Sequence, residues 1–268
     1  MADTLTLKLA NVSKSFSRVD TDQVTHAVAD INLELRDHEF VSIVGPSGCG
    51  KSTILRMIAG LVKPTTGSLT VNDRVITGPG PQIGMVFQKP TLFPWLTVRD
   101  NIAFSLRMQG KQKEHADDVE RMIRSIGLEQ FADDYPGQLS GGMAQRVALG
   151  RALISKPEIL LLDEPLGALD AFTRMKMQRE ILDMWNITRQ LVVMITHDVD
   201  EAVYMSTRVF VMEGKPGKIS HEIPIQLERP RSRKSEKFVR YRNQIMGMMS
   251  SALEDDIQDR ANKRRNEE

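Results

Sequence analysis

The stretch from Gly45 to Thr53 constrains the fold more than any other part of this chain. It follows an apolar run, Val41–Val44, and precedes a segment with the apolar spacing of a helix. The stretch fits G-x-x-x-x-G-K-[ST], whose glycines let backbone N–H groups turn toward a phosphate at the positive end of a helix. Lys51 would bring charge to the β and γ phosphates, and Ser52 a hydroxyl to Mg²⁺. The context favours a phosphate-binding loop over an ordinary turn, formed by Gly45, Pro46, Ser47, Gly48, Cys49, Gly50, Lys51, Ser52 and Thr53.

Two later apolar runs predict buried parallel strands that end at side chains suited to nucleotide chemistry. Ile159–Leu162 is followed by Asp163 and Glu164, and Leu191–Ile195 is followed shortly by His197. Parallel strands place their functional groups at their carboxyl ends. We expect Asp163 to hold Mg²⁺ through water, Glu164 to orient or deprotonate the attacking water, and His197 to sense the γ-phosphate. Adjacent acids often only cap a helix and a lone histidine is usually structural, but the upstream loop favours catalysis.

Composition limits the classes of function. The chain has 268 residues, 41% hydrophobic and 26% charged, so it can bury a large core in one domain or in a domain with an insertion. Thirty-six basic and 35 acidic residues give a formal charge of +1, which makes no global case for nucleic-acid binding. A single cysteine excludes a disulfide framework and favours a reducing compartment. Residues 1–12 lack a signal core and the apolar runs are too short to span a bilayer, so we expect a cytosolic protein.

The segments before and after the loop predict strands. Leu5–Leu9 and Ile31–Leu35 alternate apolar and polar residues, which indicates half-buried antiparallel strands. Ser68–Val75 is predicted to be a further strand, and Ile83–Gln88 a short strand that ends on an amide. Phe16 lies between the first two strands, where an aromatic ring either stacks on adenine or fills the core.

Residues 89–140 change to helical patterns with charged faces and predict an inserted helical subdomain. Its helices are expected over Val98–Arg107 and around Ala116–Ile126. Ser140 and the two glycines after it then open a helix that runs to about Ser155. A simple helix cap is the alternative interpretation of that serine.

With these motifs in this order, the chain closely resembles the nucleotide-binding subunit of ABC transporters from about Leu5 to Arg231. The resemblance implies an ATPase with a P-loop NTPase (RecA-like) α/β fold: a mainly parallel sheet, an N-terminal antiparallel β-subdomain and an inserted helical subdomain. It implies roles for individual residues: Phe16 stacks on adenine, Gln88 is the Q-loop glutamine that contacts the metal, Ser140, Gly141 and Gly142 form the signature, Asp163 and Glu164 are the Walker B pair, Asp170 belongs to the D-loop, and His197 is the switch histidine.

The same resemblance divides the chain into four parts. They are a first core part with the antiparallel strands and phosphate loop, a helical subdomain ending in the signature helix, a second core part, and a charged, helical C-terminal extension: 1–88, 89–156, 157–230 and 231–268.

The resemblance also implies partners. Two copies would form a homodimer in which each ATP, with Mg²⁺, is shared between Lys51, Ser52, Asp163 and Glu164 of one subunit and the signature of the other. The dimer would lie on the cytoplasmic face of the membrane and drive a separate permease supplied by a solute-binding protein. Three alternatives are a soluble ABC ATPase acting on DNA or the ribosome, an exporter ATPase, and a module that binds ATP without turnover.

Finer motifs resemble the nitrate, sulfonate and taurine importer branch. They are Gly78-Pro79-Gly80, the methionine that ends Leu139–Met143, Ala171–Arg174 and Leu227–Arg231. The chain departs from the usual pattern at two positions, His38, where a glycine commonly occupies the turn, and Gly150, where alanine is common.

Gln88–Leu96 joins the expected metal contact to the helical subdomain. Its prolines stiffen it, while Leu92, Phe93 and Trp95 offer apolar and aromatic surface. One interpretation places these side chains against a helix of the permease. The other places them on the helical subdomain's own core.

Overall fold

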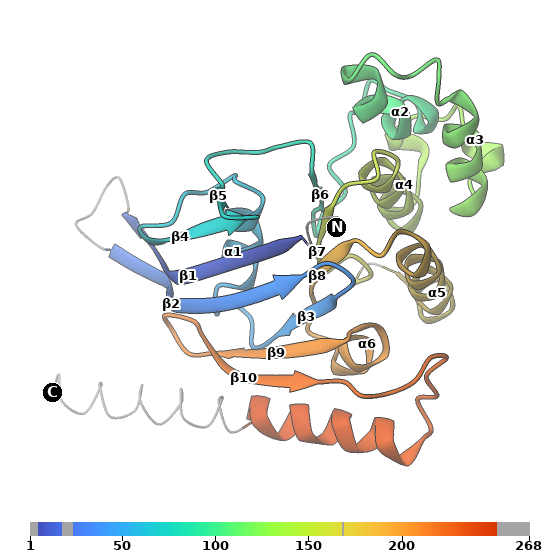
Figure 1. Cartoon of the computed structure of the whole chain (residues 1–268). Helices are drawn as coiled ribbons and strands as arrows, with labels where there is room; N and C mark the ends of the chain where they lie inside the picture. The colour runs from blue at the N-terminus through green and yellow to red at the C-terminus, as the bar shows by residue number, and fades with distance from the viewer. Residues whose placement is uncertain (1–4, 18–23, 168, 251–268) are drawn as a thin grey trace, which may run out of the picture. The chain divides into compact units, whose positions relative to one another are not determined.

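The computed structural model describes residues 5–17, 24–167 and 169–250, which form two compact units (Figure 1). The first unit comprises the described parts of Met1–Pro79 and Val193–Glu268, and the second is Gly80–Val192. The predicted subdivision into four parts stays a prediction.

The first unit contains a four-stranded antiparallel sheet in the order β2-β1-β4-β5. Leu7 lies opposite Leu35 and Leu9 opposite Leu33, so the two predicted alternating segments pair antiparallel as expected. All four leucines are buried, because each lies on the face of its strand that turns away from water. The strands are β1 (Thr6–Ser17), β2 (Val24–Arg36), β4 (Thr66–Val71) and β5 (Arg74–Val75).

The prediction of one strand over Ser68–Val75 was wrong, because this segment folds back on itself. Asn72 and Asp73 have φ angles of 47° and 60°, and they form the turn of a hairpin between β4 and β5. Two successive left-handed residues match the right-handed twist of a hairpin, and asparagine and aspartate tolerate that conformation.

The other strands of the first unit lie next to the phosphate loop. β3 (Phe40–Val44) pairs parallel with β9 (Arg208–Glu213), which pairs antiparallel with β10 (Lys218–Pro224). The helices are α1 (Lys51–Ile58) and α6 (Val199–Met205). Residues 236–250 are also helical, and this helix buries Phe238 and Ile245 in one apolar core with residues of β9 and α6. In Figure 1 the helix runs alongside β10 at the end of the described chain.

Several basic residues follow β10 between positions 229 and 242, and two arginines of this basic run have structural contacts. The Arg231 guanidinium donates to the carbonyl oxygens of Val203 and Ser206 at 2.6 Å each, and Arg229 donates to the carbonyl oxygen of Met205. These carbonyls lie at the end of α6, where the helix itself leaves acceptors without partners. Burial lowers the pKa of Arg231 to about 10, so it stays charged at neutral pH.

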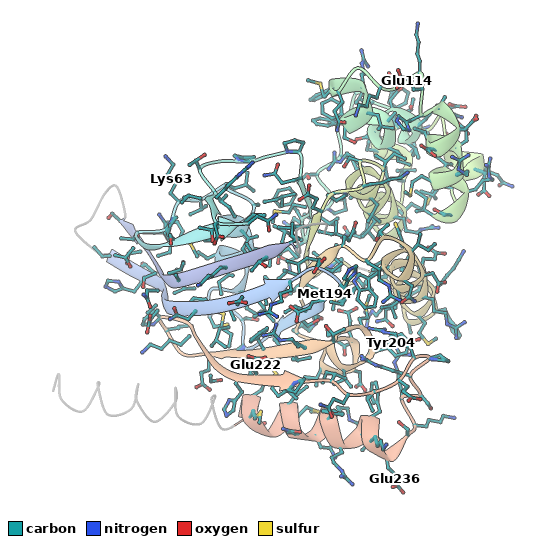
Figure 2. All side chains as sticks on the ribbon, in the orientation of Figure 1. Lys63, Glu114, Met194, Tyr204, Glu222 and Glu236 are labelled. Carbon is teal, nitrogen blue, oxygen red and sulfur yellow. The ribbon has the colours of Figure 1, made fainter. Side chains whose placement is uncertain are left out.

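Arg233 belongs to the same run and also contacts α6. Its guanidinium carbon lies 3.8 Å from the centre of the Tyr204 ring, a residue labelled in Figure 2. Such a cation–π contact adds a further attachment between the C-terminal segment and this helix.

The second unit combines strands with the predicted helical subdomain. β6 (Ile83–Val86) pairs parallel with β7 (Ile159–Asp163). The predicted helices over Val98–Arg107 and Ala116–Ile126 are present within a residue or two of their expected ends. The helices are α2 (Val98–Met108), α3 (Ala116–Ser125), η1 (Glu129–Phe131), η2 (Pro136–Gln138), α4 (Gly141–Leu153) and α5 (Ala171–Thr188).

Helices α2, α3 and α4 pack around an apolar core of their own, which includes Ile102, Ile123 and Val147. Gly150 lies where these helices meet. A Cβ atom added to Gly150 would lie 3.2 Å from Cγ of Met122 and 3.5 Å from Cδ1 of Ile102. Close packing therefore accounts for glycine at a helical position, where it otherwise weakens the helix.

The two long apolar runs are core strands. Every residue of β7 and of β8 (Leu191–Ile195) is buried. In the part of the chain that the structure describes, no helix is long and apolar enough to cross a membrane.

His38 adopts the conformation that the usual glycine would provide. Its φ of 63° lies in the left-handed region, at the turn between β2 and β3. Histidine is among the residues enriched in this region, so the turn forms without glycine.

We predict that Arg231→Met lowers the free energy of unfolding by about 2–3 kcal/mol, because the α6 carbonyls lose a charged donor. Urea denaturation would show a lower midpoint with an unchanged slope. Arg240→Met is the matched control, because Arg240 is exposed on the helix of residues 236–250. Equal midpoints for the two variants would contradict the structural role of Arg231.

Candidate active site

The phosphate loop lies between β3 and α1, as predicted. Gly50 caps α1 in a left-handed conformation with φ 95°. The Lys51 side chain is 6% exposed, and its ammonium donates to the carbonyl oxygens of Gly45 and Pro46 at 2.8 Å each. The loop thus binds its own lysine at the positive end of α1, where a phosphate would be attracted.

The loop also packs tightly against two other segments of the first unit. A Cβ atom on Gly50 would lie 2.6 Å from the carbonyl oxygen of Ala27, in β2. A Cβ atom on Gly217, in the turn between β9 and β10, would lie 1.8 Å from the carbonyl oxygen of Cys49. Gly217 is itself fixed to β2, since its N–H donates to Ala27 and its carbonyl accepts from Ala29, both at 3.0 Å. Glycine is required at these contacts because backbone approaches backbone.

Sequence reasoning missed Lys215, which comes from the same β9–β10 turn. A Cβ atom on Gly48 would lie 3.7 Å from the Lys215 ammonium nitrogen, so this lysine lies against the phosphate loop. Lys215 follows β9, which pairs parallel with β3, and β3 leads into the phosphate loop. Residues that follow parallel neighbouring strands lie at the same edge of a sheet, and this was the signal available.

Cys49 supports the loop from within. The thiol is 1% exposed, and burial raises its pKa above the usual value. It is therefore protonated at neutral pH and fills space, which is the ordinary behaviour of a buried cysteine.

Phe16 lies near the end of β1, opposite Thr25 of β2. Its side chain is 41% exposed, and the Lys14 ammonium lies 4.9 Å from the ring centre. An exposed ring fits stacking on a base better than a place in the core. Its contact with adenine stays a prediction.

His197 follows β8, also in the first unit. The N–H of Thr196 donates to the carbonyl oxygen of Ile43 at 3.4 Å, which places the end of β8 beside the end of β3. His197 is exposed at this edge, and Asp198 begins α6 as its N-cap. The contact of His197 with the γ-phosphate stays a prediction.

The second unit brings Gln88, Asp163 and Glu164 together. Val86 lies opposite Leu162 in the parallel register of β6 and β7, so the residues that follow these two strands are neighbours. The Gln88 amide donates to a carboxylate oxygen of Glu164 at 3.1 Å, while Asp163 is 3% exposed. Glu164 has a φ of 47°, an uncommon conformation for a glutamate, and such strain is concentrated at functional sites.

Ser140 and Asp170 each begin a helix. The Ser140 hydroxyl accepts from the N–H of Met143 at 3.3 Å. Ser140 is therefore the N-cap of α4, which was the alternative interpretation of this serine. The Asp170 carboxylate accepts from the N–H of Phe172 at 3.0 Å and from that of Thr173 at 3.1 Å. Hydrogen bonds with Thr173 and neighbouring N–H groups lower the pKa of Asp170 below its usual value.

The signature and the D-loop meet inside the second unit. A Cβ atom on Gly142 would lie 3.0 Å from a methyl carbon of Leu169, the residue before Asp170. A Cβ atom on Gly141 would meet open space, and Gly141 is exposed. Small residues at the start of α4 thus leave room above the helix N-terminus. The nucleotide contacts of Ser140, Gly141, Gly142 and Asp170 stay predictions.

The proposed metal ligands fit Mg²⁺ chemically. Ser52, Gln88 and Asp163 offer a hydroxyl, an amide oxygen and a carboxylate, which are the hard oxygen donors that Mg²⁺ prefers. Among residues 5–17, 24–167 and 169–250, no group of three or more His, Cys, Asp and Glu side chains could form a protein-only metal site. Mg²⁺ needs few protein ligands, because it usually keeps waters and phosphate oxygens as ligands.

A strand–loop–helix phosphate site and a buried strand that ends in Asp163 and Glu164 define a P-loop nucleotide hydrolase. The chain belongs to the ABC transporter family, whose match covers residues 28–167. It is therefore an ATPase that binds ATP, and the predicted α/β fold class is confirmed.

Relatives and solved structures agree with this assignment. An uncharacterized ABC transporter ATP-binding protein of Methanocaldococcus jannaschii is 47% identical over 248 residues, which are 92% of each chain. The aliphatic sulfonates import ATP-binding protein SsuB of Bacillus cereus is 44% identical over 243 residues, 90% of this chain and 95% of that relative. A dimeric, post-hydrolysis ATP-binding cassette bound to ADP and Pi has a TM-score of 0.73 at 32% identity, and covers 83% of this chain and 100% of its own.

We predict that Gly217→Ala weakens ATP binding by about tenfold or more, because the new methyl group must displace the backbone of Cys49 and with it the loop. Isothermal titration with ATP measures the effect. Gly78→Ala is the control, since a Cβ atom there meets open space. Wild-type affinity in a folded Gly217→Ala variant would show that the loop does not depend on this contact.

Proposed function

We propose that this protein is the ATP-hydrolysing subunit of an importer and that Glu164 is its catalytic base. The observation that carries the proposal is the hydrogen bond from the Gln88 amide to the Glu164 carboxylate at the end of β7. This contact holds a carboxylate at a strand end, where nucleotide hydrolases place the group that handles the attacking water.

In this mechanism each residue has a separate task. Lys51 leaves the loop carbonyls and binds the β and γ phosphates, while Phe16 stacks on the base. Glu164 accepts a proton from the attacking water, and His197 donates a hydrogen bond to the γ-phosphate as charge shifts in the transition state. Ser52, Gln88 and Asp163 would hold Mg²⁺, which would supply positive charge to the phosphate oxygens.

The second half of each site would come from a second copy. Ser140, Gly141 and Gly142 would direct the N-terminus of α4 at the γ-phosphate bound by the partner, so that ATP joins two subunits into a homodimer. The dimeric ATP-binding cassette described above supports this arrangement, because it is a protein of similar fold that forms a dimer.

Glu164→Gln is expected to reduce ATP turnover by on the order of 10²-fold or more, because the amide keeps the shape but cannot accept the water's proton. Phosphate release measures turnover, and titration of the same variant with ATP should give an affinity close to wild type. Turnover near the wild-type rate would remove Glu164 from the mechanism.

Import of a small anion is the transport role that the relatives support. SsuB of Bacillus cereus is named for the import of aliphatic sulfonates. By extension, this chain would work with a membrane permease and a solute-binding protein, and would lie peripherally on the cytoplasmic face. The solute would be a sulfonate, taurine or nitrate-like anion. Action on DNA or the ribosome is an alternative that co-purification of a permease would exclude. Export is a second alternative, which uptake into vesicles would exclude.

In the segment after Gln88, some side chains fit a place on the helical core, and another fits contact with a permease. Leu92 packs against the core of α2, α3 and α4, and the Phe93 ring lies 4.3 Å from that of Phe104. These contacts support a role in the helical core. Trp95 is 70% exposed although it lies 5.6 Å from Phe93, ring centre to ring centre. We infer that Trp95 offers the apolar surface for the permease, anchored by the ring beneath it.

Trp95→Ala in the assembled transporter is expected to reduce solute uptake by on the order of tenfold, because an aromatic anchor at an interface is lost. Hydrolysis by the isolated subunit should stay unchanged. Uptake into vesicles is compared with that of Ile187→Ala, which removes another exposed apolar side chain, 84% exposed, from α5. Equal uptake by both variants would rule out Trp95 as the docking residue.

A further inference from the structure

Gln145, in the second turn of α4, is a buried amide with poor hydrogen bonding. Its side chain is 0% exposed. The amide nitrogen lies 3.5 Å from the carbonyl oxygen of Phe87, at the long limit of a hydrogen bond. Throughout the described ranges, no protein group makes a hydrogen bond to its amide oxygen.

Asn101 shows how a structural amide looks in the same unit. It is also 0% exposed, and its oxygen accepts from the N–H of Phe93 at 2.9 Å. Its nitrogen donates to the carbonyl oxygens of Phe93, Leu96 and Thr97 at 2.9–3.1 Å. Asn101 therefore stabilises the fold, whereas Gln145 carries an acceptor that destabilises it.

The orientation of the Gln145 amide follows from its one neighbour. If the amide were turned over, its oxygen would face the Phe87 carbonyl oxygen, and two acceptors would meet without a proton. The nitrogen must therefore face Phe87, which leaves the oxygen without a described partner.

Phe87 connects Gln145 to the catalytic carboxylate. It directly precedes Gln88, whose amide donates to Glu164 at 3.1 Å. A contact with the Phe87 carbonyl therefore acts on the backbone that presents Gln88. The path from α4 to Glu164 lies wholly within the second unit.

We propose that Gln145 is a positioning residue for Gln88, an inference that rests on the catalytic role proposed for Glu164. In the described conformation its hydrogen bonding is incomplete. When ATP draws Gln88 into its working position, the Phe87 carbonyl comes closer to the amide nitrogen, and a backbone N–H of this segment donates to the amide oxygen. The hydrogen bonds gained by Gln145 then stabilise the hydrolysis-competent state over the resting one.

Gln145→Met tests the proposal, because methionine has similar length and volume but lacks both polar atoms of the amide. We expect the melting temperature of the full chain to rise by about 2–4 °C, because a buried acceptor without a partner is removed. We expect the maximal rate of ATP hydrolysis to fall about tenfold or more, with the dissociation constant for ATP within about twofold of wild type. A stability gain with a loss of turnover is the signature of a positioning role.

Two control variants fix the interpretation. Ser105 in α2 also has a buried oxygen without a described partner, so Ser105→Ala should raise the melting temperature and leave turnover unchanged. Asn101→Leu should lower the melting temperature, because it removes an amide whose hydrogen bonds are complete.

Three results for Gln145→Met would overturn the proposal. A lower melting temperature would make Gln145 structural, wild-type turnover would remove it from catalysis, and weaker ATP affinity would place it in binding. Glu164→Gln separates this proposal from the proposed function. Full turnover in Glu164→Gln refutes the catalytic assignment itself, whereas an inactive Glu164→Gln beside a fully active Gln145→Met refutes only the positioning role.

Discussion

The close packing of the phosphate loop against the strands beside it is the constraint on which the first unit depends. Gly217 approaches the Cys49 carbonyl so closely that no side chain fits, and Gly50 meets β2 in the same way. The shape of the loop is therefore set by β2 and by the β9–β10 turn as much as by its own glycines. Since the interior is close-packed, the loop keeps this shape before a nucleotide arrives.

In the second unit, neighbouring segments likewise fix the position of a functional group, the carboxylate of Glu164. The register of β6 and β7 brings Gln88 beside Glu164, and the helical core holds the segment that follows through Leu92 and Phe93. Glu164 also has a φ of 47°, a backbone conformation that costs energy for a glutamate. Such strain persists only where the surrounding structure holds the residue in place.

Sequence alone predicted the elements whose signal is local. Alternating leucines gave β1 and β2, apolar runs gave β7 and β8, and the complete loop motif gave α1 with its lysine. Contacts between distant segments were beyond it, which is why Lys215 and Gln145 were missed. The charge of Arg229 and Arg231 also did not reveal their structural role. Their surrounding sequence is that of a solvated surface, yet both donate to carbonyl oxygens at the end of α6. The adjacent Asn72 and Asp73, both left-handed in the structure, are residue types that favour turns, and the strand prediction overlooked this signal.

The hydrogen bonds of Lys51 have a consequence for which ligands the loop accepts. Its ammonium already has two carbonyl partners at 2.8 Å, so binding is an exchange of partners and not the filling of an empty charge site. A ligand must offer enough negative charge within reach of the lysine to replace both carbonyls. Each added phosphate brings more charge to compensate the lysine for the carbonyl contacts it gives up. The exchange of partners therefore favours ligands with several phosphates over a nucleoside, which brings no such charge.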